Sequence, residues 1–200
     1  GVHANNNIDI QEFMIIPSNK FSFKEGLRKA AEVYMHLKNN LDQNKLSTTV
    51  GDEGGFAPNF ESNEIVIEEI IKSIEETGME YGEDISLGLD CASSELYKDK
   101  IYHLEGEGNK FSSDEMIDYL MDLVNKYQII SIEDPLDESD WSAWKKLSEK
   151  TNNLQIVGDD IFVTNKELLE KGITEKVANS ILIKPNQIGT LTETFQAIDL

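Results

Sequence analysis

The sequence predicts an α/β fold in which helices alternate with the strands of a mostly parallel sheet. Three short apolar stretches, each typical of a buried strand, end in acidic residues: ISLGLD (85–90), IISIEDP (129–135) and QIVGDD (155–160). A fourth, SILIK (180–184), ends in a lysine. Strands that are apolar on both faces belong in a parallel sheet covered by helices. In barrels and open sheets of this class, the carboxyl ends of the strands carry the chemistry.

Composition narrows the class of protein. The chain has 200 residues, of which 39% are hydrophobic and 28% charged, as in soluble globular proteins. The net charge of 18 − 38 = −20 argues against direct nucleic-acid binding through a basic face. No apolar run approaches the roughly 20 residues of a transmembrane helix. The chain starts without Met and ends in a helical pattern, so we expect a part of a larger domain.

The first third contains a strand, two helices and a glycine-rich loop. FMIIP (13–17) reads as a strand with Gln11 and Glu12 at its beginning, and an antiparallel direction would bring Glu12 to the same edge as the later acids. The spacing predicts a helix from Ser22 to about residue 40, with a capping box. GDEGGFAP (51–58) predicts a tight loop that can point a carboxylate into a cavity, although a turn with solvated acids is the favoured explanation of this motif taken alone. A second helix begins with Asn63 as its cap and ends at Gly78.

The rest of the chain alternates short strands with helices. A hairpin is expected at 96–104, and helices are expected at 113–127, at 139–150, from the cap Thr164 or Asn165 to Gly172, and from about Leu191. No GxGxxG, GxxxxGK[ST] or GxSxG pattern occurs, which excludes dinucleotide, P-loop and α/β-hydrolase motifs. The order predicts a parallel α/β barrel or a doubly wound sheet in one incomplete domain.

The acids at the strand ends predict a metal site. Asp90, Glu133 and Asp159 offer hard oxygen ligands without His or Cys, which suits Mg²⁺. Three carboxylates converging on one edge would repel one another unless a cation neutralised them. Lys184, beside the same cation, would have a lowered pKa and could act as a general base. An ion pair between Lys184 and an acid is the structural alternative, and Asp134 is expected to be a structural acid.

The sequence resembles the enolase family. The resemblance rests on His3-Ala4, QEFM (11–14), VGDEGGFAP (50–58), LDCASSE (89–95), SIEDP (131–135), VGDD (157–160) and KPNQIG (184–189). These blocks occur in the family's order over residues 1–200. The sequence is similar to those of bacterial enolases in the segments DCASSE, EGNKF, LDESDW and NSILIKPNQIGTLTET.

The resemblance implies a lyase that reversibly dehydrates 2-phosphoglycerate to phosphoenolpyruvate in glycolysis through an Mg²⁺-stabilised enolate. Lys184 matches the base and Glu53 the acid that protonates the departing hydroxyl, with Glu12 assisting. The ligands of the tight Mg²⁺ are matched by Asp90, Glu133 and Asp159. Substrate contacts are implied for His3, Glu12, Glu133, Asp159 and Lys184. A lysine base with Mg²⁺ is the general pattern of enolase-superfamily sites.

The implied fold is an incomplete enolase-type TIM barrel. Residues 1–200 match part of the C-terminal catalytic barrel domain, whereas the N-terminal domain, the first barrel strand and the last strands with further phosphate- and carboxylate-binding residues are absent. A barrel lacking strands exposes sheet edges, so we expect the isolated segment to be inactive. The family further implies a cytoplasmic protein that is a homodimer or larger when full length. In bacterial relatives, an additional pool at the cell surface or outside the cell, binding to plasminogen, and binding to an RNA-degrading assembly are further expectations.

Three other functions stay open. A glycoside hydrolase barrel could use Glu53 and Glu133 as paired carboxylates, but that leaves Asp90, Asp159 and Lys184 without a role. Another enolase-superfamily member with a different acid substrate is a closer alternative. A purely binding role, as a surface or assembly protein, is the third.

Overall fold

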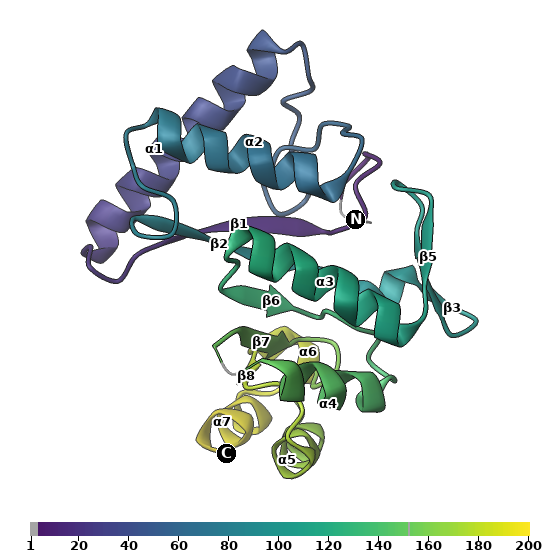
Figure 1. The fold of residues 1–200 in the computed structure, drawn as a ribbon. Helices are drawn as coiled ribbons and strands as arrows, with labels where there is room; N and C mark the ends of the chain where they lie inside the picture. Colours follow the sequence, from purple (N-terminus) through teal and green to yellow (C-terminus); the bar gives the residue numbers. More distant parts are fainter. Residues whose placement is uncertain (1–3, 152) are drawn as a thin grey trace.

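A computed structural model describes residues 4–151 and 153–200 of the protein. Its larger sheet has the strand order β1-β2-β6-β7-β8, in which the strands are Glu12–Pro17, Ile85–Asp90, Ser131–Glu133, Gln155–Gly158 and Ser180–Ile181. β1 is antiparallel to β2, and the other neighbours are parallel. The early antiparallel strand and the parallel units that follow it are therefore confirmed. Within the described residues the sheet stays open, as an incomplete barrel (Figure 1).

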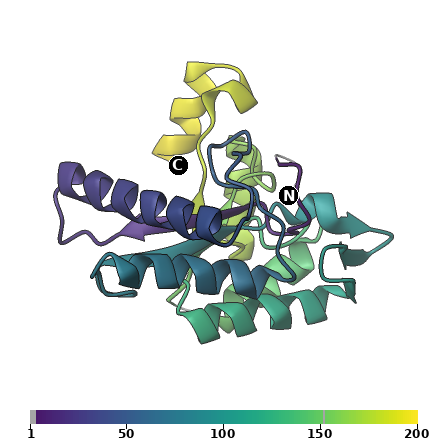
Figure 2. The same ribbon diagram turned by 90° about the horizontal axis from the view of Figure 1, so that it is seen from above.

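The helices cover one face of this sheet and its two ends. Their bounds are α1 Phe23–Gln43, α2 Asn63–Glu76, α3 Ser113–Tyr127, α4 Trp141–Lys150, α5 Lys166–Glu175, α6 Pro185–Ile188 and α7 Leu191–Asp199. α1 packs on α2 and β1, whereas α7 packs on α5 and α6 at the opposite end of the molecule (Figure 1). In the view of Figure 2, α7 stands apart from the layer formed by α1, α2 and α3.

Local capping explains where the helices begin. α3 has the bounds that its spacing predicts, and Ser112 and Glu115 form a reciprocal capping box at its start. Two predicted details are wrong. Ser62, not Asn63, caps α2, because the Asn63 amide accepts a hydrogen bond from the Ile10 amide and donates to Glu107.

The end of α5 also differs from the prediction. The helix continues past Gly172 to Glu175. A Cβ at Gly172 would lie 2.4 Å from a ring carbon of Phe162, so this glycine permits close packing and does not end the helix. Asn165 caps α5, which leaves Thr164 for a different contact.

A second, smaller sheet flanks the first. It consists of β3 (Tyr97–Lys98), β4 (Ile101–Leu104) and β5 (Asn109–Phe111), and it follows a short 3₁₀ helix at Ser93–Leu96. The hairpin of β3 and β4 was predicted from the sequence and β5 was not. The Asp9 carboxylate accepts hydrogen bonds from the Gly106 and Glu107 amides, which fastens the segment before β1 to the turn between β4 and β5.

Successive residues of β2 point to opposite faces of the larger sheet. Ile85, Leu87 and Leu89 of β2 are fully buried in the core with the helices. The alternate residues point to the other face, where Gly88 is aligned with Met14 on β1 and Ser131 on β6. A Cβ at Gly88 would lie 3.0 Å from Ile16, so this face is closely packed below the strand ends.

None of the described helices is both long enough and apolar enough to cross a membrane.

Candidate active site at the carboxyl ends of the strands

Three predicted site residues form a row across the sheet. Asp90 and Glu133 are the last residues of β2 and β6 and are aligned with each other. Glu12, at the start of antiparallel β1, is aligned with Asp90 from the other side. Side chains in a strand alternate between faces, so this row lies on the same face as the Met14–Gly88–Ser131 row, two residues further along. The predicted reversal of β1 is what brings Glu12 here.

Asp159 reaches the same edge from β7. Val157 is aligned with Glu133, and Asp159, two residues later, projects from the same side of the chain. Asp159 and Asp90 are both buried, and Glu133 is half-buried. The structure therefore places the three predicted metal ligands at one edge.

The electrostatics show that these carboxylates interact. Burial, together with the charges of Asp90 and Asp159, raises the pKa of Glu133 to about 8. Burial also raises the pKa of Asp90 to about 6, with a contribution from Glu53 and Asp159 against a hydrogen bond from the Ala92 amide. Repulsion between partly desolvated acids is the environment in which a divalent cation binds favourably.

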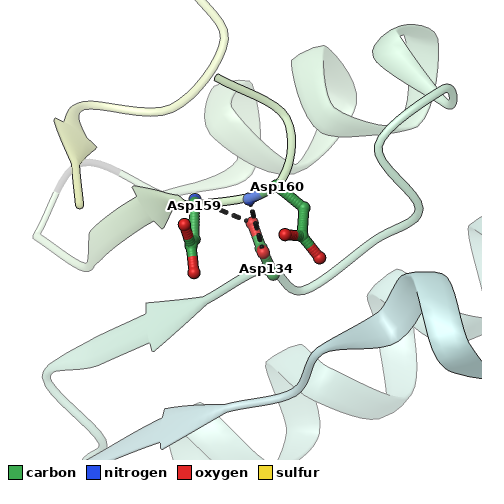
Figure 3. Close-up of side chains that lie close together, drawn as sticks. All are labelled: Asp134, Asp159 and Asp160. Carbon is green, nitrogen blue, oxygen red and sulfur yellow. Dashed lines mark hydrogen bonds between the residues drawn. The ribbon is translucent and has the colours of Figure 1, made fainter. Parts of the chain in front are cut away.

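A second acidic group overlaps the first (Figure 3). Among the described residues, the acids whose carboxylate oxygens all lie within 4.8 Å of one another, and could hold a cation, are Asp134, Asp159 and Asp160 rather than the predicted set of Asp90, Glu133 and Asp159. The Asp134 oxygens, however, accept hydrogen bonds from the Asp159 amide (3.0 Å) and the Asp160 amide (2.8 Å). Burial, partly opposed by these two bonds, raises the pKa of Asp134 to about 7. Asp134 thus fixes the turn that carries Asp159, as expected of a structural acid.

Lys184 lies at this edge, but not at the end of a strand. β8 ends at Ile181, and Lys184 is the N-cap residue of the short helix α6. Its ammonium forms an ion pair with Asp159. Burial lowers the pKa of Lys184, but the hydrogen bond to Asp159 and the neighbouring acids outweigh it, so that the pKa is raised. The lowered pKa was expected for Lys184 beside a bound cation; in the protein alone, the ion pair with Asp159 determines the protonation state.

Glu53 is presented by a loop rather than by the sheet. In the glycine-rich loop of residues 50–58, Gly54 has a φ of +88°, and the Gly51 and Gly55 backbones are hydrogen-bonded (2.9 Å). A Cβ at Gly55 would lie 3.0 Å from a Glu12 carboxylate oxygen, which places the loop against Glu12. Glu53 is exposed, yet its charge contributes to the raised pKa of Asp90. The loop therefore faces the acidic row.

Two glutamines at the site were not predicted. The Gln11 amide lies 3.4 Å from Asp90, and the Gln187 amide donates to Asp159 at 3.1 Å. Gln11 lies in QEFM, beside Glu12, and Gln187 lies in KPNQIG, three residues after Lys184. Their places in these motifs were the signal available in the sequence. His3, the predicted substrate contact, lies outside the described residues.

The comparison with protein families agrees with this geometry. The family model described as the enolase C-terminal TIM barrel domain matches residues 1–200. The match spans the sheet, the acidic edge and the glycine-rich loop alike, and it supports an enzyme of the enolase type with a divalent cation. The chain belongs to the enolase C-terminal TIM barrel domain family.

Proposed function

We propose that this chain is the catalytic barrel segment of a bacterial-type enolase, a glycolytic lyase that interconverts 2-phosphoglycerate and phosphoenolpyruvate with Mg²⁺. One observation carries the proposal: a lysine, three interacting carboxylates and a loop glutamate meet at one edge of the sheet. The open edges at β1 and β8 support the further proposal that more barrel strands complete the sheet in the intact enzyme, whereas the N-terminal domain stays a prediction.

The donor set suits magnesium. Asp90, Glu133 and Asp159 would hold the ion through carboxylate oxygens, the ligand type that Mg²⁺ prefers. Their mutual repulsion disappears when a cation shares them. When bound, the cation would neutralise charge on the substrate carboxylate and disfavour the ammonium form of Lys184.

The residues of this chain would then move two protons. The neutral Lys184 amine removes the proton from the carbon beside the substrate carboxylate, and the electron pair left behind forms the new double bond. The Glu53 carboxyl gives its proton to the hydroxyl on the next carbon, which leaves as water. Glu12, aligned with Asp90 and in contact range of Gly55, would orient the loop and the departing group. The reverse reaction uses the same residues with the protons exchanged.

A second candidate within the same family is an enzyme that acts on a different acid. All members that use a lysine and Mg²⁺ share the proton abstraction beside a carboxylate. The glycine-rich loop with Glu53 favours dehydration, because it supplies an acid for a leaving hydroxyl. A glycoside hydrolase is disfavoured by the family match.

The test uses Lys184→Ala in the intact protein that contains this chain. Turnover of 2-phosphoglycerate should fall by about 10²-fold or more, because general base catalysis contributes at least that much, while Mg²⁺ binding measured by calorimetry persists. Full turnover in Lys184→Ala would contradict the base assignment, and no turnover by the parent on 2-phosphoglycerate would favour the second candidate. The 200-residue segment by itself is expected to be inactive.

We also propose a homodimer or larger assembly for the intact protein. Phe23, Leu27 and Met35 of α1 are 88%, 61% and 51% exposed, and burying them in a subunit contact would be favourable. Sedimentation of the intact protein as a monomer would contradict this. The cytoplasmic location and the additional surface or RNA-assembly roles stay predictions.

A further inference from the structure

The turn between Asp159 and α5 contains two strained residues. Val163 and Thr164 have φ values of +44° and +56°, a region that β-branched residues rarely adopt. Such conformations are energetically unfavourable and persist only where surrounding contacts enforce them. Thr164 is fully buried, so its conformation is not the consequence of an unconstrained surface loop.

The strained backbone brings the Thr164 hydroxyl to the base. Its Oγ1 accepts a hydrogen bond from the backbone N–H of Lys184 at 2.8 Å. The same hydroxyl donates to Oε1 of Gln187 at 3.2 Å. Thr164 therefore connects the turn after β7 to the beginning of α6, where Lys184 is the N-cap residue.

Gln187 continues the connection to the metal-ligand candidate. Its Nε2 donates to Oδ1 of Asp159 at 3.1 Å, and Oδ2 of Asp159 pairs with the Lys184 ammonium. The four residues form a closed ring: Lys184 amide, Thr164 hydroxyl, Gln187 amide, Asp159 carboxylate and Lys184 ammonium. Because Thr164 donates to Oε1, the Gln187 side chain must turn its nitrogen toward the carboxylate. Each contact in the ring joins a donor to an acceptor.

We propose that Thr164 and Gln187 are positioning residues, which fix the Lys184 amine relative to Asp159 and thereby determine the geometry of proton abstraction. The proposal rests on the proposed function, because it requires Lys184 to be the base. Neither residue needs to contact substrate. Without the Thr164 hydroxyl, the Lys184 backbone amide loses its acceptor and Oε1 of Gln187 loses its donor, so that the Gln187 side chain is held only through its bond to Asp159.

The experiment compares three threonine variants of the intact protein at saturating Mg²⁺. Thr164→Val removes the hydroxyl at nearly constant volume, and Thr164→Ser retains it. Thr194→Val is the matched control, because Thr194 is also buried but donates to Thr190 within α7. The measurements are kcat, KM, the unfolding midpoint, and the kinetic isotope effect with 2-phosphoglycerate deuterated at carbon 2.

We expect kcat of Thr164→Val to fall by about 10- to 100-fold, the usual cost of losing a supporting contact at an active site. KM should change little, the isotope effect should increase, and Thr164→Ser should restore most of the turnover. A Thr164→Val enzyme with the kcat and isotope effect of Thr194→Val would overturn the proposal. Full activity in Lys184→Ala would instead overturn the proposed function, so the two failures are distinguishable.

Gln187→Met provides a second route if Thr164→Val does not fold. Gln187 is half-buried in a short helix, and methionine keeps its volume while removing both hydrogen bonds. A reduced kcat with a larger isotope effect would support the ring, whereas parent values would overturn it.

Discussion

The acidic edge of the sheet and the glycine-rich loop of residues 50–58 carry complementary parts of the site in different ways. Asp90 and Glu133 are fixed by strand register, and the turn carrying Asp159 is fixed by Asp134. Glu53 is exposed on a loop. The loop is held mainly by Tyr34 of α1, whose ring stacks on Phe56 at 4.3 Å and whose hydroxyl donates to the Gly54 carbonyl at 2.9 Å.

This difference teaches which functions require which kind of support. Charged ligands that repel one another need a rigid scaffold, because a cation can bind them only if they do not move apart. An acid that protonates a leaving group can be carried by a loop, because it needs to be near the substrate only while substrate is bound. Changes to the scaffold should therefore affect stability and cation binding together, whereas changes to the loop should affect turnover without affecting cation binding.

The largest stability effect is expected for Gly172→Ala in the scaffold. Phe162 lies between Gly158 and Gly172, and a Cβ at either glycine would lie within 2.6 Å of its ring. The added methyl group should gain about 1 kcal/mol of helix propensity but cost up to about 3 kcal/mol by overpacking. We therefore expect a lower urea midpoint and weaker cation binding.

Gly26→Ala is the matched control, since Gly26 is also a buried helical glycine but its Cβ would lie 3.3 Å from Pro17. If Gly172→Ala were as stable as Gly26→Ala, the close packing around Phe162 would not be a constraint.

A smaller effect, on turnover, is expected for Tyr34→Phe in the loop support. The variant keeps the stacking on Phe56 and loses the hydrogen bond to Gly54, which is worth about 0.5–1.5 kcal/mol. We expect kcat to fall several-fold, in line with that energy, with Mg²⁺ affinity unchanged.

Tyr127→Phe serves as the control, because that hydroxyl contacts Glu64 and Glu68 instead. Equal kcat values for the two variants would show that Tyr34 does not support the loop.

The smallest effect concerns the segment before β1, where burial raises the pKa of Asp9 despite hydrogen bonds from the Gly106 and Glu107 amides. An acid with a raised pKa in the folded state binds its proton more tightly than in the unfolded state. Its contribution to stability is therefore present below its unfolded pKa and is lost as pH rises through the folded pKa.

Asp9→Asn removes this titration. The stability of the variant relative to the parent should increase as pH rises from the ordinary range of an aspartate pKa to neutrality, as measured by urea unfolding at each pH. A pH-independent difference between the two proteins would contradict the raised pKa.

The sequence predicted the parts of the site that depend on strand periodicity. Asp90 and Glu133 could be placed because their strands are short, apolar and interrupted by acids, and Glu12 could be placed once β1 was read as antiparallel. The prediction that Lys184 ends a strand was less accurate. β8 pairs only over Ser180–Ile181, and the apolar residues that follow lie beyond the hydrogen-bonded ladder.

The ring around Thr164 was beyond the reach of sequence pattern. In sequence, Thr164 and Asn165 are equally good helix caps, and only the positive φ of Thr164 removes it from that role. Likewise, β5 depends on pairing with β4, because two of its three residues, Asn109 and Lys110, have little strand propensity. Contacts between distant segments decide such features.

The most direct test of the account is calorimetric titration of the intact protein with Mg²⁺, comparing Glu133→Gln with Glu53→Gln. If the strand ends hold the cation and the loop supplies the acid, Glu133→Gln should lose Mg²⁺ binding, and Glu53→Gln should bind Mg²⁺ like the parent while losing turnover. The contrary result is Mg²⁺ binding that survives in Glu133→Gln but is abolished in Asp160→Asn, which would assign the cation to Asp134, Asp159 and Asp160.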